Sequence, residues 1–272
     1  MTNKEPKRSD KKPELLMPAG NMDTFKAAIA GGADAVYLGT KNFNARTRAH
    51  NFTWKQLAIA VETAHHHNAK VYVTLNTVIK NREIPELLDT LHTLNQINPD
   101  AVIIQDWGVF FLASTFFPKL NLHASTQMAI HNSQGVNHAS KAGIKRTILA
   151  RELTMNELKG IREKTTAEIE IFVHGALCYS FSGMCLYSSF NGGQSANRGL
   201  CKQPCRRIFN TKQGKKLPFS LKDLETIDLV PEFATIGIDS LKVEGRLKTV
   251  NYVYNVAKSY RAVIDNPSNI DE

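Results

Sequence analysis

The chain has 272 residues and a net charge of +9, from 34 Lys and Arg against 25 Asp and Glu. This length suits one large domain, such as a barrel of about 250 residues, and no apolar run approaches the roughly 20 residues that span a bilayer. The N-terminus is polar and rich in lysine, without the apolar stretch of a signal peptide. We therefore expect a soluble, cytoplasmic protein with no membrane partner, whose basic balance permits an anionic partner such as RNA.

Short apolar, β-branched runs alternate with longer helical patterns from residue 14 onward, which is the rhythm of βα units. The predicted strands are Glu14–Pro18, Ala35–Gly39, Val71–Asn76, Ala101–Gln105, Asn121–Ser125, Thr147–Ala150, Glu168–His174 and Ser240–Glu244. The predicted helices are Asp23–Ala30, Trp54–His67, Glu83–Asn95, Val109–Phe116, Ser133–Ala142, Met155–Lys164 and Val250–Ile264. This alternation predicts a (β/α)8 barrel of the TIM type over residues 14–264. An open doubly wound sheet has a similar rhythm, but no dinucleotide-type glycine fingerprint or P-loop favours it.

An insertion at about residues 175–222 separates the seventh predicted strand from the eighth. It contains a predicted hairpin, with strands Arg206–Phe209 and Lys216–Leu221 around a turn at Gln213 and Gly214, and a short helix is expected after it near Leu224–Phe233. Outside the barrel, residues 1–13 have the composition of a disordered basic tail. Residues 265–272 resemble a linker or a truncated C-terminus.

All the cysteines of the chain lie in this insertion, within 28 residues: Cys178, Cys185, Cys201 and Cys205. Four thiolates in one loop-rich segment suit a zinc ion or an iron–sulfur cluster, and in a reducing compartment they are better read as ligands than as disulfides. Their spacings of six, fifteen and three residues differ from the two-residue knuckles of zinc fingers. An iron–sulfur cluster is therefore the favoured interpretation, with zinc and no metal as the alternatives.

The insertion is also strongly cationic. Residues 171–222 contain no Asp or Glu and eight Lys or Arg, so this window supplies +8 of the net charge of +9. Arg198, Lys202, Arg206 and Arg207 lie close to the cysteines in sequence. We expect these four to offset the negative charge of a thiolate-bound cluster or to contact RNA phosphates.

Polar residues follow several predicted strands, where a barrel carries its active site. Arg46, His123, Gln127 and Arg246 are predicted to bind small molecules there, and His174 and Glu244 are the catalytic candidates. Arg151 follows the sixth strand in the same way. Simpler alternatives exist, because His123 also suits a buried, hydrogen-bonded strand position, and Glu244 with Arg246 also suits an ion pair at a strand end.

Several of these segments resemble peptidase family U-32, the collagenase-like family. They are Glu170–Cys178 (EIFVHGALC), Asn197–Arg206 (NRGLCKQPCR) and Lys242–Arg246 (KVEGR), and the resemblance covers roughly residues 14–264. It implies an oxygen-independent hydroxylase whose four cysteines hold a 4Fe–4S cluster, with prephenate, a small dicarboxylate, as co-substrate. The segments Val73–Thr77 and His123–Gln127 are most similar to the branch that modifies a cytidine of 23S ribosomal RNA, and the branch acting on a tRNA wobble uridine comes next.

Two other functions remain open at this point. The name of the family records a peptidase, and one branch acts as a paired hydroxylation partner in ubiquinone synthesis. The sequence offers no HExxH helix for a conventional zinc protease. A closed set of four cysteine ligands would also leave a zinc ion no open coordination position. An enzyme that hydroxylates RNA is therefore the first expectation, and a peptidase is the alternative.

Overall fold

The computed structural model describes residues 11–47, 49–182 and 184–268, and in it eight parallel strands close into a barrel. They are β1 (Glu14–Pro18), β2 (Ala35–Gly39), β3 (Lys70–Leu75), β4 (Ala101–Ile104), β5 (Leu122–Ala124), β6 (Arg146–Ile148), β7 (Glu168–Ala176) and β11 (Ser240–Val243). Each strand pairs with the next in this order, and β11 pairs with β1, so the ring is complete. The predicted (β/α)8 barrel is confirmed.

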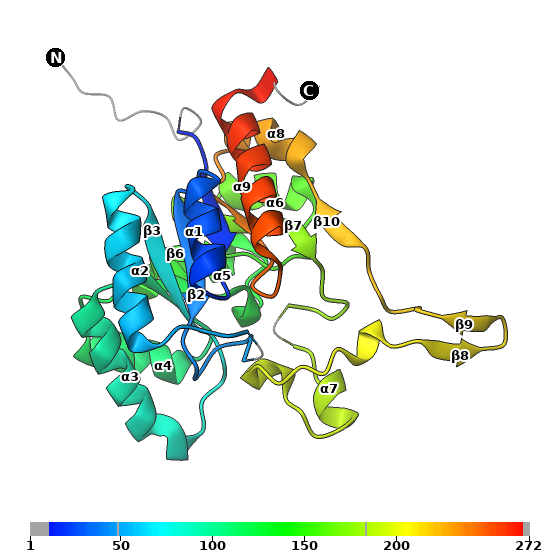
Figure 1. Cartoon of the computed structure of the whole chain (residues 1–272), viewed down its shortest axis with the longest axis horizontal. Coiled ribbons are helices and arrows are strands. Elements are labelled where there is room, and N and C mark those ends of the chain that lie inside the picture. The colour runs from blue at the N-terminus through cyan, green and yellow to red at the C-terminus, as the bar shows by residue number, and fades with distance from the viewer. Residues whose placement is uncertain (1–10, 48, 183, 269–272) are drawn as a thin grey trace.

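Helices cover the outside of the barrel (Figure 1). They are α1 (Met22–Ala30), α2 (Trp54–His66), α3 (Ile84–Ile97), α4 (Trp107–Phe116), α5 (Ser133–Ala142), α6 (Met155–Arg162), α8 (Val230–Ile236) and α9 (Val250–Asp265). A capping box begins α6, since the Thr154 side chain accepts from the Glu157 amide while the Glu157 carboxylate accepts from the Thr154 amide. Among the described residues, no helix is long and apolar enough to cross a bilayer.

The first and last described segments of the chain lie beside each other at the end of the barrel where the strands begin. Of the predicted basic tail, only residues 11–13 are described, and residues 1–10 lie outside the described ranges. Lys12 forms an ion pair of 2.9 Å with Asp265, the last residue of α9 and the first of the predicted linker. Residues 269–272 of that linker also lie outside the described ranges.

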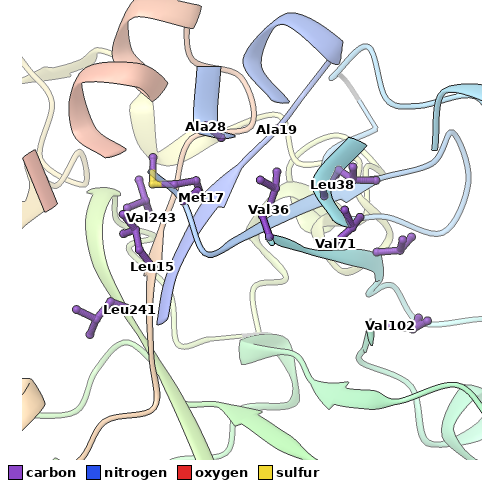
Figure 2. Packing of buried hydrophobic residues seen from close by; sticks show 14 of the residues in the cluster. Leu15, Met17, Ala19, Ala28, Val36, Leu38, Val71, Val102, Leu241 and Val243 are labelled. Atoms are coloured by element: carbon purple, nitrogen blue, oxygen red, sulfur yellow. The ribbon is translucent and has the colours of Figure 1, made fainter. Parts of the chain in front are cut away.

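The main core lies between the barrel wall and the helices. Side chains of a strand alternate between its two faces, so one set points outward on every strand. Met17, Val36, Leu38, Leu241 and Val243 belong to this set, and all are fully buried under the helices (Figure 2). Each such aliphatic side chain contributes about 1.5–3 kcal/mol by its removal from water.

The inward set is partly charged. Arg146 is the first residue of β6 and lies in the half of the barrel where the strands begin, called the lower barrel below. Its guanidinium pairs with Glu14, with Glu168 at 2.9 Å and with Glu170 at 3.3 Å. Glu170 is completely buried and also accepts a 2.8 Å hydrogen bond from the Lys242 ammonium. Buried charges persist only when paired, and this network lies inside the barrel beside a small buried apolar cluster that includes Leu16, Tyr72 and Ile148. Glu168 and Glu170 thus both lie on the inner face of β7 and form ion pairs.

The insertion leaves the barrel at the end of β7, and its return strand pairs with β7. Strand β10 (Asp223–Glu225) runs antiparallel to β7, with Asp223 opposite Ala176. Between them lie α7 (Tyr187–Phe190) and a hairpin of β8 (Phe209–Thr211) and β9 (Gly214–Lys216), which stands away from the barrel wall in Figure 1.

Two boundary predictions in this region are corrected. The hairpin exists, but Thr211 pairs with Gly214, so its turn lies at Lys212 and Gln213, and its strands end well short of Leu221. The short helix predicted near Leu224–Phe233 begins only at Val230, because the residues before it pair with β7 as β10 and then form a short 3-10 turn. Pro231 stands in the first turn of this helix, where its missing amide hydrogen costs nothing.

Candidate functional site

A cavity of about 630 Å³ lies between the insertion and the barrel mouth, and all four cysteines line it. Its other walls include Arg46, Gln127 and Arg151, which follow β2, β5 and β6. The same three residues also line a smaller cavity of about 50 Å³ that reaches Lys242 inside the barrel. The cysteine loop therefore faces the carboxyl ends of the strands, where barrel enzymes bind their substrates.

The four cysteines share this cavity without a disulfide. Cys178 is exposed, and Cys185, Cys201 and Cys205 are half-buried. Burial raises the pKa of the Cys205 thiol, the neighbouring sulfurs of Cys178 and Cys201 raise it further, and Arg206 opposes them. Within the described ranges, no three His, Cys, Asp or Glu side chains converge on a single ion position. All four cysteines thus line one cavity, and Cys178 and Cys201 are close enough to Cys205 to influence its thiol electrostatically.

The insertion is fastened to the loops after β2 and β3. The Thr47 hydroxyl donates a 2.8 Å hydrogen bond to the Gly199 carbonyl oxygen. Gly199 has φ +77°, and a Cβ at this position would lie 2.3 Å from the Asn44 carbonyl oxygen, so only glycine fits. Arg198 pairs with Glu83 and donates a 2.8 Å hydrogen bond to the Val78 carbonyl oxygen. Arg198 was expected to contact a cluster or RNA, but its charge is used in this attachment.

Two arginines make the barrel mouth cationic. Arg46 donates a 3.0 Å hydrogen bond to the Glu244 carboxylate. Burial raises the pKa of Glu244, but the charges of Arg46 and Arg151 outweigh it and keep this pKa below its usual value. The Arg151 guanidinium lies over the Phe172 ring, 4.5 Å from its centroid, and its Nε has no hydrogen-bond partner. Arg151 therefore presents free donors to an anion in the cavity.

Arg246 lies deeper, under the floor of the site. It is buried and donates to Asn51, and at 3.3 Å to both Asn44 and Thr74. Burial lowers the pKa of its guanidinium to about 10. Among the described residues, Glu244 forms its ion pair with Arg46 and not with Arg246. The alternative of a Glu244–Arg246 ion pair is therefore wrong.

His123 and Gln127 differ in their access to the cavity. His123 is buried inside the barrel, where its ring meets the Tyr72 ring edge-on at 4.9 Å and its Nδ1 has no partner. Burial and the charge of Arg146 hold the pKa of His123 well below its usual value, so the ring is neutral at pH 7. Gln127 lines both cavities, and its Oε1 is buried without a hydrogen-bond partner. Of these two candidates, Gln127 is the one in position to meet a ligand.

His174 faces away from the site. The pairing of β7 with β11 shifts by one residue, so that Lys242 lies opposite Phe172 but Val243 lies opposite His174. This bulge places His174 on the outer side with Val243, where its ring contacts Tyr252 and Tyr260 of α9. Burial lowers its pKa, although Glu225 and Asp223 oppose this. The expectation that His174 faces the barrel mouth with the other candidates is wrong.

The other three cations predicted to lie beside the cysteines differ in their surroundings. Arg206 lines the cavity and ties the insertion together, because it donates to the carbonyl oxygens of Leu177 at 2.9 Å and Leu221 at 2.7 Å and to the Ser220 hydroxyl at 3.0 Å. Lys202 and Arg207 are exposed and are not among the residues that line the cavity.

Two residues of the inner site were not among the sequence candidates. Arg151 belonged to the pattern of polar residues after strands, which was the signal that could have identified it. Lys242 had no such signal, because a lysine in the middle of a strand is more often at the surface. Its ammonium lies 4.4 Å from the Tyr37 ring centroid and lines the inner cavity.

Comparisons with known proteins find relatives that match most of this chain. The tRNA hydroxylation protein P1 of Bacillus subtilis is 38% identical over 94% of this chain, an uncharacterized protease of Methanocaldococcus jannaschii is 42% identical over 93%, and the 23S rRNA 5-hydroxycytidine C2501 synthase of Escherichia coli is 39% identical over 93%. The chain spans 64%, 65% and 39% of the lengths of these relatives, respectively, which is less than two thirds in each case.

A solved structure shows the same fold. The structure of a U32 peptidase superposes with a TM-score of 0.59 at 14% identity, covering 86% of this chain and 93% of the other. The sequence model of peptidase family U32 matches residues 20–271, which include the barrel strands from β2 to β11 and the whole cysteine insertion. On these grounds the chain belongs to peptidase family U32.

Proposed function

We propose that this chain is the catalytic barrel of an RNA hydroxylase. It would hydroxylate a pyrimidine, with a cytidine of 23S ribosomal RNA as the favoured target and a tRNA wobble uridine as the next. A 4Fe–4S cluster on Cys178, Cys185, Cys201 and Cys205 and prephenate as co-substrate complete the proposal. The observation that carries it is the single cavity that joins the four cysteines to the cationic barrel mouth. The relatives named for tRNA hydroxylation and for 5-hydroxycytidine synthesis support RNA as the substrate.

The donor set suits a cluster better than a single zinc ion. A zinc site requires its sulfurs to converge on one point, whereas a four-iron cluster binds one cysteine at each iron and so fills a space among them. All four cysteines line one cavity, which supports a ligand larger than a single ion. When bound, the cluster supplies one-electron chemistry, while the protein supplies charge compensation from Arg206 beside Cys205.

The small co-substrate is assigned to the arginines of the mouth. A dicarboxylate needs planar, charged donors, and the arginine guanidinium is the side chain best shaped for a carboxylate. Arg151 has free donors and is held by the Phe172 ring. Arg46 is held by Glu244, so it contributes charge while its own position stays fixed. Gln127 adds an unsatisfied amide oxygen to the same wall.

The test is mass spectrometry of nucleosides from cells that lack this gene, complemented with the wild type or with Cys178→Ala. We expect 5-hydroxycytidine in ribosomal RNA to disappear in the deletion and to return only with the wild type. Loss of a tRNA wobble modification instead would transfer the assignment to uridine. If no RNA nucleoside changes, the hydroxylase is refuted, and the peptidase and quinone-pathway alternatives would be tested with peptide substrates and quinone analysis.

A further inference from the structure

We infer that the β8–β9 hairpin is an arm that holds the RNA backbone beside the cavity. For this inference the arm is defined as residues 207–217, and the inference rests on the proposed function. The hairpin stands away from the barrel on the side where the cysteine insertion covers its mouth (Figure 1).

The root of the arm is fixed next to the cavity. The Phe219 ring packs edge-on against Phe209, at 5.3 Å between centroids, and against Tyr179 at 5.2 Å. Tyr179 follows Cys178 directly and lines the cavity. Arg206 adds hydrogen bonds that join the Leu177 and Leu221 carbonyl oxygens on either side of the root. The direction of the arm is therefore set by contacts with the cysteine loop itself.

The outer part of the arm carries charge that the protein leaves unpaired. Lys212, Lys215 and Lys216 are exposed, and none of them belongs to an ion pair among the residues that the structure describes. No Asp or Glu occurs between residues 171 and 222, so nothing in the insertion neutralises them. An extended strand advances about 3.4 Å per residue, so the turn at Gln213 stands roughly 14 Å beyond Phe209.

A polyanionic strand is the partner that these features fit. Ile208 and Leu217, at the root of the arm, are 65% and 49% exposed, so its surface combines apolar and cationic contacts. At the cavity rim, Tyr179 and Phe181 are 55% and 58% exposed, and bases splayed out of RNA stack on such rings. RNA phosphates bound to the arm would thus hold the RNA strand so that a base a few nucleotides away reaches the cavity rim.

The experiment compares two triple variants with the wild type. One is Lys212→Gln/Lys215→Gln/Lys216→Gln. The matched control, Lys141→Gln/Lys145→Gln/Lys164→Gln, removes the same charge from exposed lysines at the opposite end of the barrel. Binding of a single-stranded RNA of about 16 nucleotides is measured across a salt series, and circular dichroism and iron content verify that each variant is intact.

The arm variant is expected to lower the slope of log affinity against log salt by about 2, because each lost phosphate contact removes roughly 0.7. The wild type should therefore lose roughly 20-fold more affinity than this variant between about 50 and 200 mM salt, and the control should follow the wild type. Equal slopes for all three proteins would refute RNA binding by the arm, even if nucleoside analysis supports the hydroxylase. Displacement of the RNA by anionic lipid vesicles would overturn RNA as the occupant. A reduced slope for the arm variant, together with no change in any RNA nucleoside, would support RNA binding by the arm and refute the hydroxylase.

Discussion

Replacing Glu14 with glutamine is expected to destabilise the barrel by about 3 kcal/mol at neutral pH. Burial raises the pKa of Glu14, but Arg146 and Lys70 lower it more, to about 2 from an ordinary value of 4.5. A difference of about 2.5 pH units corresponds to about 3 kcal/mol of stability when the carboxylate is ionised. Glutamine keeps the shape and one acceptor but loses the charge that the network in the lower barrel requires.

The pH dependence has a definite sign. Because the folded-state pKa of Glu14 is depressed, its contribution is complete above about pH 5 and is lost as the pH falls toward 2. The difference between wild type and Glu14→Gln should therefore shrink from about 3 kcal/mol at pH 7 to about 1 kcal/mol at pH 3. Thermal melting followed by circular dichroism measures this, with an expected midpoint difference of roughly 6–12 °C at pH 7 and about 2–4 °C at pH 3.

Glu168→Gln is the matched control. Glu168 pairs with the same Arg146 at 2.9 Å, but its side chain is 42% exposed, so water screens the pair and the loss should stay below about 1 kcal/mol. A midpoint difference for Glu14→Gln that is the same at both pH values would refute the reasoning, because the stabilisation would then come from packing and not from the ionised carboxylate.

Four further outcomes follow from the site. Cys178→Ala is expected to remove bound iron, sulfide and visible absorption together, and stoichiometric zinc without iron in the wild type would contradict the cluster. Arg151→Met should raise the KM for the dicarboxylate roughly tenfold to a hundredfold, with Arg151→Lys recovering part of the loss; an unchanged KM would place the co-substrate elsewhere. Gly199→Ala should loosen the insertion, seen as faster proteolysis, whereas Gly160→Ala, where the backbone is helical and a Cβ meets nothing within 4 Å, should not. His174→Gln should leave kcat within about twofold, because its ring packs against α9, and a large loss would restore a catalytic role.

The barrel could be predicted because its signal is local. Each strand is a short buried run, and the eight strands lie within one or two residues of their predicted bounds. By contrast, β10 is a strand only because Asp223–Glu225 pairs with β7, a partner that no local pattern identifies. The predicted helix was placed too early for this reason.

The site could be predicted in part, and its failures have physical causes. Strand ends placed Arg46, Gln127 and Glu244 at the barrel mouth, because parallel strands end at one face, and their roles there stay predictions. His174 was misplaced because one bulged residue exchanges the two faces of a strand, and bulges leave no clear trace in a sequence. Arg198 was misjudged because its partner Glu83 lies 115 residues away.

The insertion departs from Ala176 and returns at Asp223, and these two residues lie opposite each other on paired strands. None of its described residues from 177 to 222 belongs to the buried apolar clusters of the barrel. A segment of this kind can gain or lose length without moving the strands beneath it. The barrel and the cysteine insertion can therefore diverge at separate rates during evolution, so the same barrel can carry insertions of different length and composition.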